Sequence, residues 1–167
     1  MSDRKKGRPA FAVHPMWKFL QETYSMEEAF RFFGPYRGAS IFPSIVDTHT
    51  VDVRMPLVVS NTNYVGTQFG GSLYSMADPF YMFLLMWNLG PDYIVWDKSA
   101  QIEFIKPGVG EVHARFHIPP EEIETVREIV AHERKTTRFY ETDILGEAGE
   151  VVAHVTKEVY VRAPRSK

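Results

Sequence analysis

The chain has 167 residues, of which 44% are hydrophobic and 24% charged, a composition typical of one globular domain with a sizeable core. Nineteen basic and 21 acidic residues give a formal net charge of -2, which provides no general attraction to nucleic acid. There is no cysteine, which excludes disulfides, thiolate zinc sites and a cysteine nucleophile.

The N-terminal part of the chain (1–40) is predicted to be a basic tail followed by a helical extension. No signal-type apolar segment follows the basic start, so we expect a cytoplasmic protein whose first ten residues are frayed. Aromatic residues recur at helical spacing over 15–22 and 26–33, and Ser25 with Glu28 forms a capping box for the second helix. These helices either cover one end of the core or act as a lid over a ligand tunnel.

A strand is predicted over 45–57, because apolar and polar residues alternate there with a period of two. Pro56 indicates that this strand lies at the edge of the sheet or is close to its end, since proline cannot donate a hydrogen bond to a neighbouring strand.

The segment from Gly70 to Asn88 is predicted to be a long central helix. It is apolar nearly all round, so other parts of the chain must cover it on several sides. It would be roughly 28 Å long, but Asp78 and Pro79 leave an apolar run too short to cross a membrane. Asp followed by Pro is also typical of a helix that restarts at a new N-cap, so a purely local reason for these two residues stays open.

Four further strands follow the helix, with a helix start between the second and the third. They are predicted over 93–105, 111–118, 135–145 and 150–162. In the first of them, the alternation places one set of residues on one face: Ile94, Trp96, Lys98, Ala100, Ile102 and Phe104. The predicted fold is α+β, with a curved antiparallel five-stranded sheet wrapped around one long central helix, in a single domain whose core spans 41–163.

The spacing of residues around the start of the helix resembles that of a known family. Asn63 is followed six residues later by Phe69-Gly70-Gly71, and Asp78 follows Gly71 by seven residues. In the hotdog-fold acyl-CoA thioesterases of the phenylacetate-pathway (PaaI) type, the same spacings join an Asn, a His-Gly-Gly and an Asp. The chain is most similar to an uncharacterised YiiD C-terminal-like branch, with which it shares the phenylalanine before the glycines and the string ADPFYM.

This resemblance implies a homodimer that acts on acyl-CoA, formed edge to edge along the strand after the central helix; a further pairing into tetramers stays open. Coenzyme A would enter as part of the substrate, and neither a metal nor a redox cofactor is implied. The chain departs from the family at Phe69, which replaces a histidine that helps to place the thioester.

The residues themselves suggest how a thioester could be hydrolysed. The free amides of Gly70 and Gly71 at a helix N-terminus are suitable donors to an oxyanion. Asp78 is the only carboxylate of the apolar segment, and the burial expected there favours a role as base or nucleophile. Seven helical residues separate Gly71 from Asp78 by about 10 Å, so we expect Asp78 to come from the partner subunit. Asn63 would orient water or substrate, or only stabilise its own turn.

Five further residues are candidates for substrate binding, each with a simpler alternative: Phe69, Thr67, Ser75, Lys98 and Lys106. Thr67 and Ser75 could reach the substrate, although such hydroxyls more often bond to nearby backbone. The two lysines could meet the phosphates of coenzyme A, or be solvated surface residues.

The sequence therefore predicts an acyl-CoA thioesterase and leaves two alternatives. One is a binding module for acyl-CoA that lacks efficient chemistry because Phe69 replaces the histidine. The other is a dimerisation scaffold, which predicts that Phe69 and Tyr74 fill the space beside the helix N-terminus and leave no cavity there.

Overall fold

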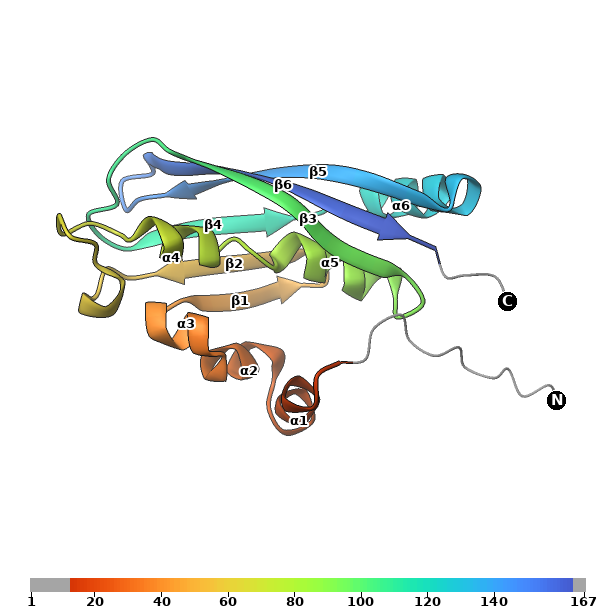
Figure 1. Ribbon diagram of the computed structural model, residues 1–167, viewed down its shortest axis with the longest axis horizontal. Helices are drawn as coiled ribbons and strands as arrows, with labels where there is room; N and C mark the ends of the chain where they lie inside the picture. Colours follow the sequence, from red (N-terminus) through yellow and green to blue (C-terminus); the bar gives the residue numbers. More distant parts are fainter. Residues whose placement is uncertain (1–12, 164–167) are drawn as a thin grey trace.

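The structure of the protein is a computed structural model that describes residues 13–163 (Figure 1). Its strands form one antiparallel sheet in the order β1-β2-β4-β5-β6-β3. The strands are β1 (Phe42–Asp47), β2 (Thr50–Met55), β3 (Ile94–Phe104), β4 (Val112–His117), β5 (Lys135–Leu145) and β6 (Val151–Arg162). The predicted fraying of the first ten residues lies outside the described residues.

The prediction of five strands is wrong by one, because the strand expected over 45–57 is a hairpin of two strands. The Asp47 carboxylate accepts a hydrogen bond from the His49 amide (2.7 Å), which stabilises a tight turn between β1 and β2. β2 therefore lies between β1 and β4 rather than at an edge, and it ends at Met55, just before Pro56. The proline that does occupy an edge strand is Pro43 of β1.

The central helical segment consists of α4 (Gly70–Ser75) and α5 (Phe80–Leu89), which follow one another along the inner side of the curved sheet (Figure 1). A turn over 76–79 separates them, since Pro79 has no amide to continue the first helix. The predicted segment is therefore present but interrupted, and Asp78 lies in the interruption.

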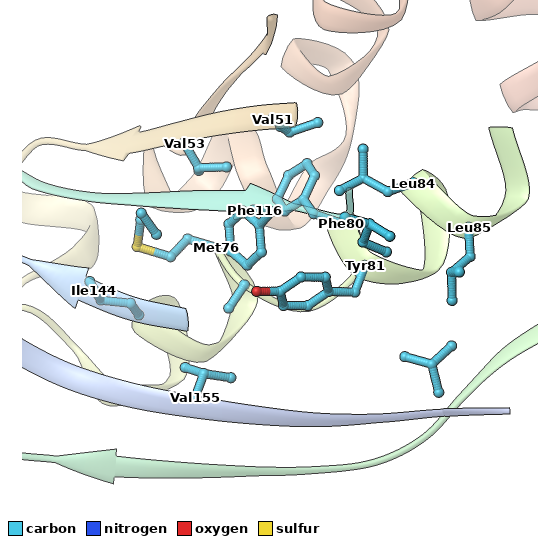
Figure 2. Close-up of a cluster of buried hydrophobic side chains, with 14 of the residues drawn as sticks. Val51, Val53, Met76, Phe80, Tyr81, Leu84, Leu85, Phe116, Ile144 and Val155 are labelled. Atoms are coloured by element: carbon cyan, nitrogen blue, oxygen red, sulfur yellow. The ribbon is translucent and has the colours of Figure 1, made fainter. Parts of the chain in front are cut away.

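Side chains of α5 pack against the inner face of the sheet, as the prediction of an apolar helix requires. Figure 2 shows Phe80 and Tyr81 beside Phe116 of β4, and the ring centroids of Tyr81 and Phe116 are 5.3 Å apart. Leu84 and Leu85 are fully buried in the same core.

Three short helices precede the sheet: α1 (Pro15–Thr23), α2 (Met26–Phe32) and α3 (Gly34–Ala39). The predicted capping box is confirmed, because the Ser25 hydroxyl accepts from the Glu28 amide and the Glu28 carboxylate accepts from the Ser25 amide. Phe30 and Tyr36 are buried, and the Phe30 ring lies 5.9 Å from that of Phe80. The helical extension thus covers one end of the core.

Two further elements complete the fold: η1 (Val59–Asn61), a short 3-10 turn, and α6 (Pro120–Glu133). The helix start predicted after β4 is correct, and it continues for 14 residues because Ile123, Val126 and Val130 form an apolar stripe that is buried.

Candidate active site

Asp78 lies at the centre of a hydrogen-bonded cluster in the turn between α4 and α5. The Tyr74 hydroxyl donates to its Oδ1 atom at 2.8 Å, and the Lys157 Nζ donates to the same oxygen at 3.0 Å. The Asp78 Oδ2 atom has no hydrogen-bond partner within residues 13–163. One carboxylate oxygen is held by two donors and the other is available.

The Lys157 side chain comes from the inner face of β6 and is only 1% exposed. Its Nζ atom lies 3.3 Å from the Asp97 carboxylate of β3. Burial alone lowers the pKa of Lys157, but the charges of Asp97 and Asp78 outweigh burial and raise it above its ordinary value. The lysine is therefore an ammonium ion shared by two carboxylates.

The surroundings of Asp97 disfavour its ionised form. Burial raises its pKa, and the nearby Lys157 charge offsets only part of that effect. Its Oδ1 atom is buried and has no partner among the described residues. With both carboxylates ionised, the cluster carries one more negative than positive charge.

The expectation that Asp78 is buried is wrong for the single chain. Its side chain is 49% exposed, because it lies in the turn between the helices and not on a covered helix face. The interruption at Pro79 thus brings a carboxylate to the surface of an otherwise apolar segment.

A cavity of about 290 Å³ lies against Asp78. Its walls are mainly aromatic and come from the N-terminal helices, α4 and α5, with Trp17, Phe33, Tyr36 and Phe83 among them. Burial raises the pKa of Tyr36 well above its ordinary value, and its hydroxyl has no partner within residues 13–163. We call this space the Asp78 cavity; its lining suits an apolar group with a polar end.

A second cavity, of about 440 Å³, lies at the N-terminus of α4. It brings together four of the residues predicted from the sequence: Asn63, Thr67, Gly70 and Lys106. No hydrogen bond within residues 13–163 uses the amides of Gly70 and Gly71, as expected for the first residues of a helix. We call it the Gly70 cavity. Its presence contradicts the scaffold alternative, which predicted a filled space.

The amide group and the oxygen of the Asn63 side chain both form hydrogen bonds within its own loop. Its amide group donates to the Thr67 hydroxyl (2.8 Å) and the Gln68 carbonyl (3.3 Å), and its oxygen accepts from the amides of Val65 and Thr67. The loop is therefore shaped by the turn chemistry that the sequence left open. A contact between Asn63 and a substrate stays a prediction.

Phe69 lies outside both cavities, and its side chain is exposed. A Cβ atom on Gly71 would lie 2.4 Å from the Phe69 ring, and one on Gly70 would lie 2.8 Å from the Phe104 ring. Only glycine therefore lets these two rings approach the start of α4 so closely.

The remaining predicted residues lie apart from one another. Ser75 lines the Asp78 cavity, but its hydroxyl donates to the Gly71 carbonyl (2.8 Å). Lys98 lies on the outer face of the sheet in an ion pair with Glu158 (2.6 Å). Of the two lysines considered for coenzyme A, only Lys106 lies beside the Gly70 cavity.

Sequence reasoning missed Asp97 because a β-bulge lies between Asp97 and Ser99. A one-residue shift moves the following side chains to the opposite face. Val95 is therefore buried and Trp96 is 57% exposed, the reverse of the predicted alternation for this half of the strand. Ala100 pairs with Lys157, so Asp97 and Ala100 both lie on the inner side.

Lys157 could have been found from the sequence. It stands at an inward position of β6 between Val155 and Val159, where the alternation calls for an apolar residue. A charged residue at such a position needs a partner of opposite charge.

Two further features are absent from the described part of the chain. Residues 13–163 contain no group of three or more His, Asp or Glu side chains that could hold a metal ion. None of the helices described there is both long enough and apolar enough to span a membrane.

The curved sheet, the central helices and the glycine pair at the start of α4 define a hotdog-fold protein. The chain belongs to the DUF4442 family, a domain of unknown function whose family model matches residues 24–161. No curated protein matches it in sequence.

Solved structures confirm the fold at low sequence identity. A protein of unknown function from Pseudomonas aeruginosa, described as a probable thioesterase, is 19% identical, with a TM-score of 0.75 over 82% of this chain and 93% of that chain. A protein of unknown function from Chlorobaculum tepidum is 18% identical, with a TM-score of 0.68 over 89% and 92%. A thioesterase from Haemophilus influenzae is 12% identical, with a TM-score of 0.61 over 93% and 95%.

Proposed function

We propose that the protein hydrolyses acyl-CoA thioesters, with Asp78 as the general base. The observation that carries the proposal is a half-exposed carboxylate with one oxygen held and one oxygen available, in the wall of an aromatic cavity. The thioesterase names of structural relatives from Pseudomonas and Haemophilus support the same class of reaction.

In this reaction the acyl group would occupy the Asp78 cavity, whose apolar walls favour it over the coenzyme. Asp78 would take a proton from water, and the resulting hydroxide would attack the thioester carbon. The amides of Gly70 and Gly71 would stabilise the oxyanion. Cleavage of the carbon–sulfur bond would release the thiolate, which takes up the proton, leaving a carboxylic acid and free coenzyme A.

We propose that each site is shared between two subunits of a homodimer. The Gly70 and Asp78 cavities are separate within one chain and hold different parts of the proposed machinery. A twofold partner could place the Gly70 cavity of one chain against the Asp78 cavity of the other, with Lys106 toward the phosphates of coenzyme A.

The two edges of the sheet support β3 as the strand that meets the partner. The β1 edge carries Pro43 and is covered by α2, where the Glu27 carboxylate accepts from the Ile45 amide. β3 forms the other edge over 11 residues and bonds only to β6 among the described strands. Phe104 and Ile105 are exposed at its end, as expected of a surface that a second chain covers.

The first test is thiol release from short, long and aromatic acyl-CoA esters by the native chain and by Asp78→Asn. We expect turnover of at least one ester, lowered at least about 100-fold in the variant. The chain contains no cysteine, so it adds no thiol background. Binding of acyl-CoA without turnover of any ester would contradict the proposal and favour the binding module, with Phe69→His as the next variant.

The shared site is tested by mixing two variants, Asp78→Asn and Gly71→Ala, each of which is expected to lower activity strongly on its own. The Cβ atom that Gly71→Ala adds would lie 2.4 Å from the Phe69 ring, so the ring or the start of α4 must shift and the amide is displaced from the oxyanion. After subunit exchange, a mixed dimer retains one intact site, so about a quarter of native activity should return. Gly38→Ala is the control for the second variant, because nothing lies within 4 Å of the added Cβ atom in α3. No recovery despite exchange, shown by mass-labelled subunits, would place both residues in one chain's site.

A further inference from the structure

The Asp78 carboxylate is held asymmetrically. Both of its protein donors, the Tyr74 hydroxyl and the Lys157 ammonium, contact Oδ1. Two donors on one oxygen, one of them charged, restrict the rotation of the carboxylate group. They leave Oδ2 for a different contact.

The Lys157 donor is held by contacts on several sides. Lys157 lies on the inner face of β6, a strand paired on both sides with β3 and β5. Its ammonium lies 5.5 Å from the centre of the Tyr74 ring and 3.3 Å from Asp97. A long side chain that is held along its length loses the freedom that usually makes lysine an imprecise donor.

Packing alone does not explain the lysine. A methionine at the same inward position would fill similar space without a charge, and it would not need Asp97. Asp97 in turn leaves its buried Oδ1 without a partner among the described residues. Burial of the Asp97 carboxylate is thus unfavourable in itself, but that carboxylate stabilises the cation that bonds to Asp78.

We propose that Lys157 and Tyr74 are positioning residues, which hold Asp78 by Oδ1 so that Oδ2 receives the proton of the attacking water. Asp97 holds Lys157 in place and does not touch the substrate. This inference rests on the proposed function. It adds residues of β6 and β3 to a site for which the sequence motif named only residues between Asn63 and Asp78.

The decisive experiment compares Lys157→Met with the double variant Lys157→Met/Asp97→Asn. The single variant leaves a buried carboxylate without its cation, so its denaturation midpoint and its kcat both fall. The double variant removes that carboxylate, so the midpoint recovers, while kcat stays about 10- to 100-fold low because Asp78 is no longer held. Recovery of both quantities would overturn the proposal, since Lys157 would then only neutralise Asp97.

Tyr74→Phe tests the second donor in a chain that keeps both carboxylates and the lysine. We expect kcat to fall several-fold with KM unchanged, because the hydroxyl bonds to Asp78 rather than to substrate. An increase in KM alone would contradict this, as it would place the hydroxyl against the substrate.

A spectroscopic readout separates failure of this inference from failure of the proposed function. The Lys157 ammonium should give a protected nitrogen resonance that shifts in Asp78→Asn, whereas Lys98→Met should leave it unchanged. An unshifted resonance would overturn the contact whatever the activity. A shifted resonance in a protein that hydrolyses no ester would refute the proposed function, and with it the catalytic part of this role.

Discussion

The two faces of β6 hold their charged side chains in different ways. On the inner face, Lys157 is 1% exposed and lies between two carboxylates. On the outer face, Glu158 pairs with Lys98 at 2.6 Å and His154 pairs with Asp143 at 2.7 Å. Water can solvate the outer groups when a pair opens, whereas the inner lysine has almost no exposed surface and depends on its two carboxylates.

The comparison shows which charged residues indicate a functional role. An exposed pair contributes little to stability, so its presence carries little information. Each buried ion must overcome the loss of its hydration, and replacing a buried ion pair by apolar residues often gives a protein that is as stable. The inner cluster therefore requires a reason beyond stability, and its contact with Asp78 supplies one.

The largest effect on stability is expected from Lys157→Met. Removing one member of a buried cluster should lower the free energy of unfolding by about 3–5 kcal/mol at neutral pH, because Asp97 is left buried with no cation. Urea denaturation followed by tryptophan fluorescence measures it. A loss as small as that of a surface substitution would show that water reaches the inner cluster.

A smaller effect is expected from Asp78→Asn. Lys157 keeps Asp97 as a partner, and Asp78 is half exposed, so the loss of stability should be about 1–2 kcal/mol. The loss of thiol release should be far greater than this change in stability can explain. Equal losses of activity and of folded protein would remove the reason for the inner cluster.

Lys98→Met is the matched test on the outer face, since the lysine also faces a carboxylate across β3 and β6. Its urea midpoint should stay close to that of the native chain, because exposed pairs are weak. A shift of the urea midpoint as large as that of Lys157→Met would contradict the difference between the two faces.

The smallest effect is expected from His154 and should depend on pH. The hydrogen bond to Asp143 raises the pKa of His154 above 6.5 in the folded chain. A raised histidine pKa means that the pair's stabilisation is fully present below pH 6.5 and is lost as pH rises through the folded value. Melting temperatures of the native chain and His154→Gln should therefore differ slightly at about pH 5.5 and converge at about pH 9. A gap that widens with pH would contradict this sign.

The capping box, the apolar central segment and the last four strands followed from local rules, because each depends on neighbours within a few residues. The first hairpin was missed because its turn depends on one Asp47 contact and not on a glycine signal. The Gly70 cavity was partly predictable, since the loop that carries Asn63 leads directly into α4.

The sequence by itself determined the central apolar segment, the four strands after it, the glycine pair at a helix start and a carboxylate seven residues later. Only the tertiary structure decided which groups meet that carboxylate, because Lys157 is 79 residues from Asp78 along the chain and comes to it through the sheet. The β-bulge after Asp97 turned a second carboxylate inward, which a period of two does not anticipate. Local rules describe contacts between residues that are close in sequence. A buried ion cluster depends instead on the register of strands that are distant in sequence.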